Sequence, residues 1–171
     1  MESLFTATTG IASHFDGDCK SRALKFYNEV YMKMNKEQKN VYIIVCDGFF
    51  CGAMEAYNYA TKAVGFDRGL TDGQRIFQVG INADAALSAF RKLQNMWGLD
   101  VDKTCDKITE VDKWIVRSGS HSHICRPVDS NGVEHVKTVR EIWNDMVRFE
   151  KTRTEFRKSM EAKAKADNER R

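Results

Sequence analysis

Apolar residues recur along much of this chain at spacings of three and four, which is the period of an α-helix. Over residues 82–97 they form a single stripe of Ala86, Leu87, Phe90, Leu93 and Trp97. Asn82 can cap this segment and Gly98 can end it. Residues 103–117 carry a second stripe of Ile108, Val111 and Ile115. The short link between the two segments predicts a pair of antiparallel helices.

A helix is also predicted from Asp18, whose side chain can cap it, to about Lys36. Its expected inner face consists of Leu24, Tyr27, Val30, Tyr31 and Met34. The run Val41–Cys46 is rich in β-branched residues and is too short for its pattern to distinguish a buried strand from a buried helix. Turn residues at 129–132 suggest a small hairpin near 124–136.

The end of the chain, from Lys137 to about Lys165, predicts one long amphipathic helix. Its seam consists of Val139, Ile142, Met146, Phe149, Phe156 and Met160, with Arg153 as an interruption. The sequence therefore predicts a mainly α fold with at most a small β element, at 41–46, at 124–136 or at both. We expect a single helical domain over 1–150, and a projecting C-terminal helix with a frayed tail over 151–171.

Composition agrees with a globular helical protein, since 42% of the residues are hydrophobic, 30% are charged and Pro127 is the single proline. The five cysteines are an odd number, and the first residues lack a basic stretch followed by an apolar one. Both features predict an intracellular, reducing compartment such as the cytoplasm. The most apolar region, 41–66, contains Asp47, Glu55 and Lys62, so no membrane span is expected.

Two clusters suggest metal chemistry. On a strand, His121, His123 and Cys125 would share a face, and imidazole and thiolate groups are zinc ligands. The chain lacks the paired ligand spacing of a zinc finger, so we expect no cofactor and keep zinc as an alternative. The carboxylates of Asp16 and Asp18, joined by Asp47, could hold Mg²⁺, although such residues are also ordinary turn and cap residues.

The terminal helix carries the positive charge of the chain. From Arg148 onward there are nine basic and five acidic residues, whereas the whole chain has a formal net charge of +3. A basic helix with an apolar seam can pack on a partner helix or contact phosphates. The residues expected to contact a partner are Phe149, Arg153, Phe156, Arg157 and Met160.

The sequence thus favours a non-enzymatic binding or assembly protein that associates with itself, as an oligomer or coiled coil, or with another protein through this helix. A nucleic-acid-binding protein is an alternative, which would use the terminal helix together with Arg91, Lys92, Lys103 and Lys107. A metal-dependent enzyme is a second alternative, which would use His121, His123 and Cys125, or Asp16, Asp18 and Asp47. No nucleophile is singled out by its neighbours, so no catalytic residue is predicted.

Overall fold

One continuous helical run from Lys36 to Ala60 lies at the centre of the fold. In the computed structural model, which describes residues 17–63, 65–66, 69–118 and 131–171, this run comprises α3 (Lys36–Ile43), the π-helix η2 (Ile44–Phe50) and α4 (Cys51–Ala60). It starts at a capping box, in which Asn35 and Gln38 each accept the other's backbone N–H. The apolar run Val41–Cys46 is therefore helical, and the strand alternative is wrong. Burial of Tyr42, Val45 and Cys46 among other helices overrides the β propensity of this run.

Helix α5 (Asp72–Trp97) is longer than the stripe from Ala86 to Trp97 indicates. It begins at Thr71, whose side chain accepts the Gln74 N–H while Gln74 accepts the Thr71 N–H. The predicted cap at Asn82 is wrong, because Asn82 lies inside the helix and donates to the Gln78 carbonyl. The predicted end is confirmed, since Gly98 adopts a left-handed conformation (φ 64°).

Small residues allow the central run to pack closely against α5. A Cβ on Gly52 would lie 3.0 Å from the Ala86 nitrogen and 3.1 Å from the Asn82 carbonyl oxygen. One turn earlier, a Cβ on Gly48 would lie 2.6 Å from the Ala89 Cβ. Glycine at both positions therefore lets the two helix backbones approach each other, and Ala83 and Ala86 are fully buried in the contact.

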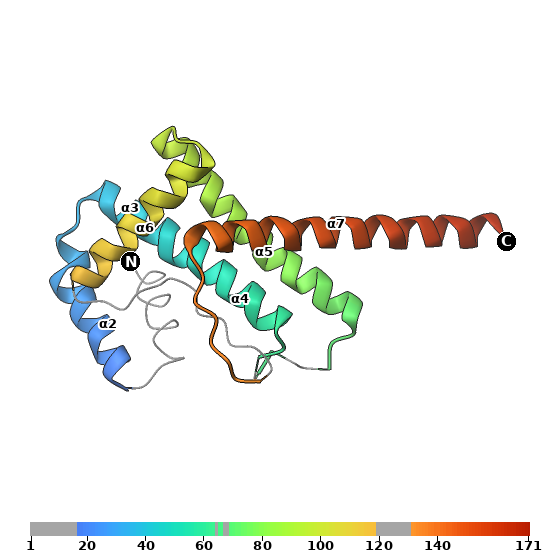
Figure 1. Cartoon of the computed structure of the whole chain (residues 1–171), viewed down its shortest axis with the longest axis horizontal. Helices are drawn as coiled ribbons and strands as arrows, with labels where there is room; N and C mark the ends of the chain where they lie inside the picture. The colour runs from blue at the N-terminus through green and yellow to red at the C-terminus, as the bar shows by residue number, and fades with distance from the viewer. Residues whose placement is uncertain (1–16, 64, 67–68, 119–130) are drawn as a thin grey trace.

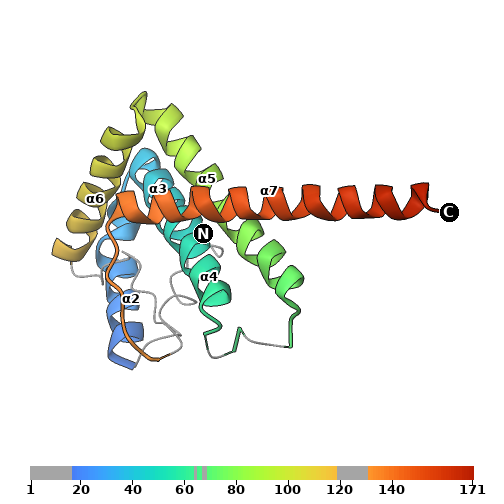
Figure 2. The same cartoon turned by 45° about the vertical axis from the view of Figure 1, so that its right-hand side comes forward.

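Helix α6 (Val101–Arg117) starts at Asp100, which caps it by accepting the Lys103 N–H. Its predicted inner residues Ile108 and Ile115 are fully buried. The predicted antiparallel pairing with α5 is not observed along the length of the two helices, because they diverge from the Gly98 turn (Figure 2). The helix that runs antiparallel along α5 is instead α7 (Val139–Glu169). Residues later in α7 contact residues earlier in α5: Trp143 contacts Phe90, and Phe156 contacts Phe77.

The N-terminal part of the described chain packs against α3, the first part of the central run. Helix α2 (Gly17–Glu29) ends seven residues before the predicted limit at Lys36, and a short 3₁₀-helix η1 (Tyr31–Lys33) follows it. Phe26 and Tyr31 are buried against the Tyr42 ring, at centroid distances of 5.4 and 5.8 Å. Leu24, which the pattern placed on the inner face, is exposed.

The molecule is thus mainly α-helical with a long C-terminal helix, as predicted (Figure 1). Most of the predicted hairpin, residues 124–130, lies outside the described part of the chain, and residues 131–138 contain no helix or strand element. Within the described residues, no helix is both long and apolar enough to cross a membrane.

Candidate interaction surface

The first part of α7 is bound tightly to the rest of the protein. Val139, Ile142 and Met146 are buried, as their seam positions predict. Trp143 lies half-buried beside them with its ring centroid 6.0 Å from that of Phe90. These contacts fix the direction in which α7 leaves the body.

A polar cluster around Asp145 adds a directional contact between α7 and α4. The Tyr57 hydroxyl donates to Asp145 Oδ2 at 2.5 Å, and Lys137 Nζ lies 2.7 Å from the same oxygen. Arg148 pairs with Asp145 Oδ1 at 3.2 Å. Sequence reasoning missed this cluster, because Tyr57 and Asp145 are 88 residues apart and no local pattern links them.

Three of the five residues expected to contact a partner lie against the protein's own body. Phe149 is half-buried and meets the Tyr57 ring edge-on at 5.8 Å. The side chain of Arg153 lies over Gly80, where an added Cβ would overlap it, and pairs with Glu150 at 2.7 Å. Phe156 meets Phe77 edge-on at 5.5 Å. The docked half of α7 therefore extends from Val139 to Phe156, six residues beyond the predicted domain limit at residue 150.

Beyond Phe156 the helix continues without cover from the body. Every residue from Arg157 to Arg171 is exposed, although the helix extends to Glu169 (Figures 1 and 2). We call this segment the projection. It includes the two other residues expected to contact a partner, Arg157 and Met160, and Met160 is 49% exposed.

The projection has an excess of positive charge. Its basic residues are Arg157, Lys158, Lys163, Lys165, Arg170 and Arg171, and its acidic residues are Glu161, Asp167 and Glu169. Within this segment, Arg157 Nε lies 4.0 Å from Glu161 Oε1, and both side chains are more than half exposed. At such exposure the pair leaves the net positive charge of the projection accessible to a partner.

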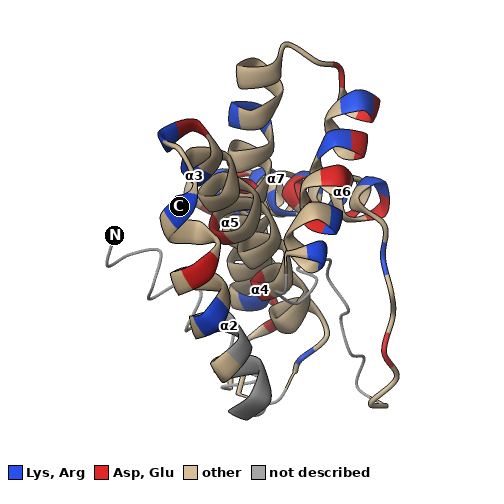
Figure 3. Cartoon of the chain, turned by 90° about the vertical axis from the view of Figure 1, so that its left-hand side faces the viewer, with Lys and Arg blue, Asp and Glu red and all other residues tan. Residues whose placement is uncertain are grey.

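The basic residues predicted on the central helices do not extend this surface. Arg91 and Lys92 lie near the end of α5 that contacts Trp143, whereas the projection leaves the body beyond the opposite end of α5. Lys103 and Lys107 are on α6, where acidic and basic residues alternate (Figure 3). The structure therefore does not combine these residues and the projection into one basic face.

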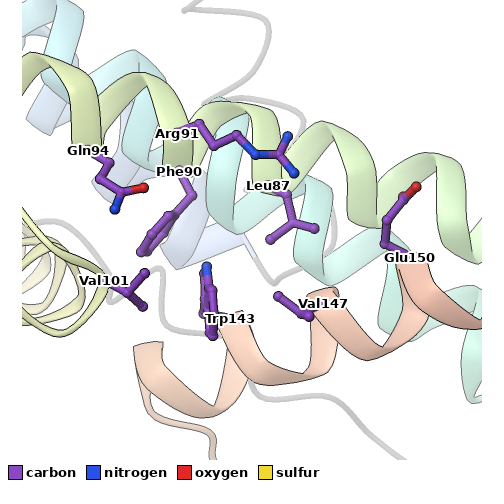
Figure 4. A pocket seen from close by; sticks show the side chains of 8 residues that line it. All are labelled: Leu87, Phe90, Arg91, Gln94, Val101, Trp143, Val147 and Glu150. Atoms are coloured by element: carbon purple, nitrogen blue, oxygen red, sulfur yellow. The ribbon is translucent and has the colours of Figure 1, made fainter.

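A small cleft of about 200 Å³ lies where α5, α7 and the start of α6 meet (Figure 4). Its walls are mostly apolar, formed by Leu87, Phe90, Val101, Trp143 and Val147. The polar lining residues are Arg91, Gln94 and Glu150, and Glu150 already pairs with Arg153. Among the lining residues there is no hydroxyl, thiol or imidazole group, and the one carboxylate is that of Glu150.

Most residues of the two predicted metal clusters fall outside the described part of the chain. His121, His123, Cys125 and Asp16 lie outside the described part, as does the side chain of Asp18. Asp47 is exposed on η2 and does not stand at the end of a strand; partial burial raises the pKa of its carboxyl. Among the described residues no three His, Cys, Asp or Glu side chains are grouped to hold a metal ion.

Cys46, Cys51 and Cys105 are free thiols. Burial, together with nearby acidic groups, raises the pKa of Cys51 to about 12 and raises that of Cys46 well above its usual value. Burial also raises the pKa of Cys105. Since the thiolate is the reactive form, these residues are poor candidates for redox chemistry or catalysis.

Comparisons with protein-family models, curated proteins and solved structures find no match for this chain. A functional assignment therefore depends on the chain's own residues. Among the described residues, the feature that packing within the protein explains least is the exposed, basic projection of α7.

Proposed function

We propose that the protein is a non-enzymatic binding protein that associates with a protein partner through the projection of α7, from Arg157 to Arg171. One observation carries the proposal: α7 continues for about four turns after its last aromatic contact with the body, and every residue of these turns is exposed. A long helix is a costly feature to maintain in solvent unless its residues favour helix strongly.

The composition of the projection meets this requirement. Ala162, Ala164 and Ala166 alternate with lysines and glutamate, which are strong helix formers, and neither glycine nor proline occurs after Gly132. Such a segment can stay helical without burial, so it can present its side chains to a partner in a fixed arrangement. The order of the helix before binding reduces the entropy lost on association.

Self-association through this helix is less well supported than association with a different protein. The seam of the docked half continues past Met160 with Lys163, Asp167 and Arg170, so a coiled coil between two copies would place charged groups in its core. Two projections would also bring like net charges together. A different partner can supply both apolar surface and negative charge.

Nucleic acid remains a second candidate, favoured by the six basic side chains of the projection. Contacts to phosphates would make the affinity fall steeply with salt concentration. Three acidic residues are interspersed among the basic ones and would face the same phosphates. This arrangement favours a protein partner over a phosphate backbone.

The test compares the full chain with a variant that ends at Phe156. We expect the shortened protein to keep a helical circular dichroism spectrum and its cooperative unfolding, because the contacts of the docked half remain. Both proteins, immobilised at equal density, are incubated with extract from cells that express the full chain, with and without nuclease. A protein partner should be retained by the full chain alone and in both conditions. Equal retention by the two forms would place the binding surface elsewhere and contradict the proposal.

A further inference from the structure

An apolar row crosses from α5 to α7 at the point where the projection begins. Phe77 and Phe156 are in ring contact at 5.5 Å. Ile81 is one helical turn from Phe77, and Met160 is one turn from Phe156, so the four side chains are successive neighbours. The two outer members are among the most exposed large apolar residues described, at 51% for Ile81 and 49% for Met160. The row thus offers apolar surface on both sides of a half-buried ring contact.

The surroundings of this row differ in charge at its two ends. On α7, Arg157 and Lys163 lie one turn before and after Met160, on the two flanks of its side chain. On α5, the residues around Ile81 are the uncharged Gln74, Gln78, Ala85 and Ser88, of which Gln74 and Ala85 are exposed, and Asp84 lies one turn after Ile81. An occupant of the row would therefore meet positive charge mainly on the α7 side.

We propose that this row binds an amphipathic helix of another protein, with the apolar side of that helix on Ile81, Phe77, Phe156 and Met160 and acidic residues facing Arg157 and Lys163. The proposal rests on the proposed function and specifies the chemistry of its partner. Burying an apolar row between helices supplies affinity, and complementary charge at the rim sets orientation and rate of association.

The row also distinguishes this partner from the other two occupants. Nucleic acid would use the basic groups but would gain little from the apolar side chain of Ile81, because phosphates are contacted by charged and polar groups. A second copy of this chain would bring its own positive projection against Arg157 and Lys163. An acidic amphipathic helix is the occupant that uses both the apolar row and the flanking charge.

The test is a binding selection with the full chain and a displayed library of 20-residue helical peptides of randomised surface sequence. We expect the enriched peptides to combine apolar residues at helical spacing with Asp and Glu on one flank. Their affinity, measured by fluorescence anisotropy, should fall at least tenfold for the Ile81→Glu/Met160→Glu variant. The control variant Met96→Glu/Val116→Glu changes two exposed apolar residues elsewhere and should leave the affinity within about twofold.

The charge contribution has its own matched pair of variants. Arg157→Glu/Lys163→Glu should weaken the same peptides at least tenfold, whereas Lys158→Glu/Lys165→Glu changes the same net charge on the opposite side of the helix and should have a much smaller effect. Circular dichroism establishes that each variant is folded. If the two pairs of substitutions lower the affinity equally, the peptides are held by non-specific electrostatic attraction and not by a defined site. That result would overturn the inference.

The outcomes separate this inference from the proposed function. The selection could instead enrich peptides that lack acidic residues and no longer bind when the chain ends at Phe156. That result would contradict the inference and leave the proposed function standing. Peptides retained equally by the shortened chain would contradict both. Binding of a 20-base-pair DNA duplex that survives Ile81→Glu/Met160→Glu, with no peptide enriched, would overturn the inference in favour of nucleic acid.

Discussion

The docked half and the projection of α7 belong to one uninterrupted helix and yet meet opposite surroundings. The docked half has Val139, Ile142, Met146 and Phe149 along its inner face, and these side chains lie against α4 and α5. The same face of the projection has Met160 as its one large apolar residue, followed by Lys163 and Asp167. Helix formation therefore depends on residue propensity along the whole segment, whereas docking depends on the apolar seam and ends where that seam ends.

The position of Arg153 shows how the docked half extends past the strongest part of its seam. A long charged side chain at a seam position would ordinarily keep two helices apart. Here it lies over Gly80, which has no side chain, and its guanidinium pairs with Glu150. The aliphatic part of the arginine thus serves as packing surface, which brings Phe156 within reach of Phe77.

The largest difference between the two halves should appear when a methionine is truncated in each. Met146→Ala removes a fully buried side chain and should lower the free energy of unfolding by about 2–5 kcal/mol. Met160→Ala removes an exposed one and should change it by less than about 0.5 kcal/mol. Urea unfolding followed by circular dichroism measures both. Similar losses for the two variants would show that Met160 is part of the core.

A smaller effect is expected at the crossing of Gly80 and Arg153. Gly80→Leu would overlap the Arg153 side chain and should destabilise the protein by about 1–3 kcal/mol, as overpacked contacts do. Arg153→Ala should relieve part of this cost, so the double variant should be more stable than the sum of the single effects predicts. Ala85→Leu, at an exposed position of the same helix, is the control. Additive single effects would mean that the two residues do not touch.

The polar cluster on the docked half should contribute less again. Tyr57→Phe removes the hydroxyl that donates to Asp145 and should cost about 1.5 kcal/mol, the lower part of the range for hydrogen bonds to charged groups, because Lys137 and Arg148 still pair with that carboxylate. Tyr59→Phe on the same helix serves as the control. A loss no greater than the control's would show that the hydroxyl bond does not hold α7 on α4.

The smallest effect is expected within the projection. Glu161→Gln removes the partner of Arg157 in a pair that is more than half exposed, and should change the free energy of unfolding by less than about 0.5 kcal/mol. Thermal unfolding at low and moderate salt measures this change. A loss above about 1 kcal/mol would place Glu161 in a contact with the body.

Local patterns in the sequence predicted those features that depend on near neighbours. The stripes of α6 and the docked half of α7 placed Ile108, Ile115 and Ile142 in the core, where they are. The start of α5 was also encoded locally, as Thr71 and Gln74 of a capping box, but Asn82 nearer to the apolar stripe was preferred to it. The contacts that decide the extent of docking were not encoded locally. Arg153 on Gly80 and Tyr57 on Asp145 join residues that are far apart in the chain, so only the assembled fold identifies them.

Amide hydrogen exchange along α7 tests most directly the claim that the helix is docked to Phe156 and free beyond it. Buried amides exchange through unfolding of the domain, whereas an unsupported helix opens from its end. We predict strong protection at Ile142–Phe149, decreasing protection up to Phe156, and weak protection from Lys158 to Glu169 that the Met146→Ala variant leaves unchanged. The contrary result is that residues 158–169 are protected as strongly as residues 142–149 and that Met146→Ala removes the protection of both segments. This result would contradict the account, because it would show that the projection is part of the folded core.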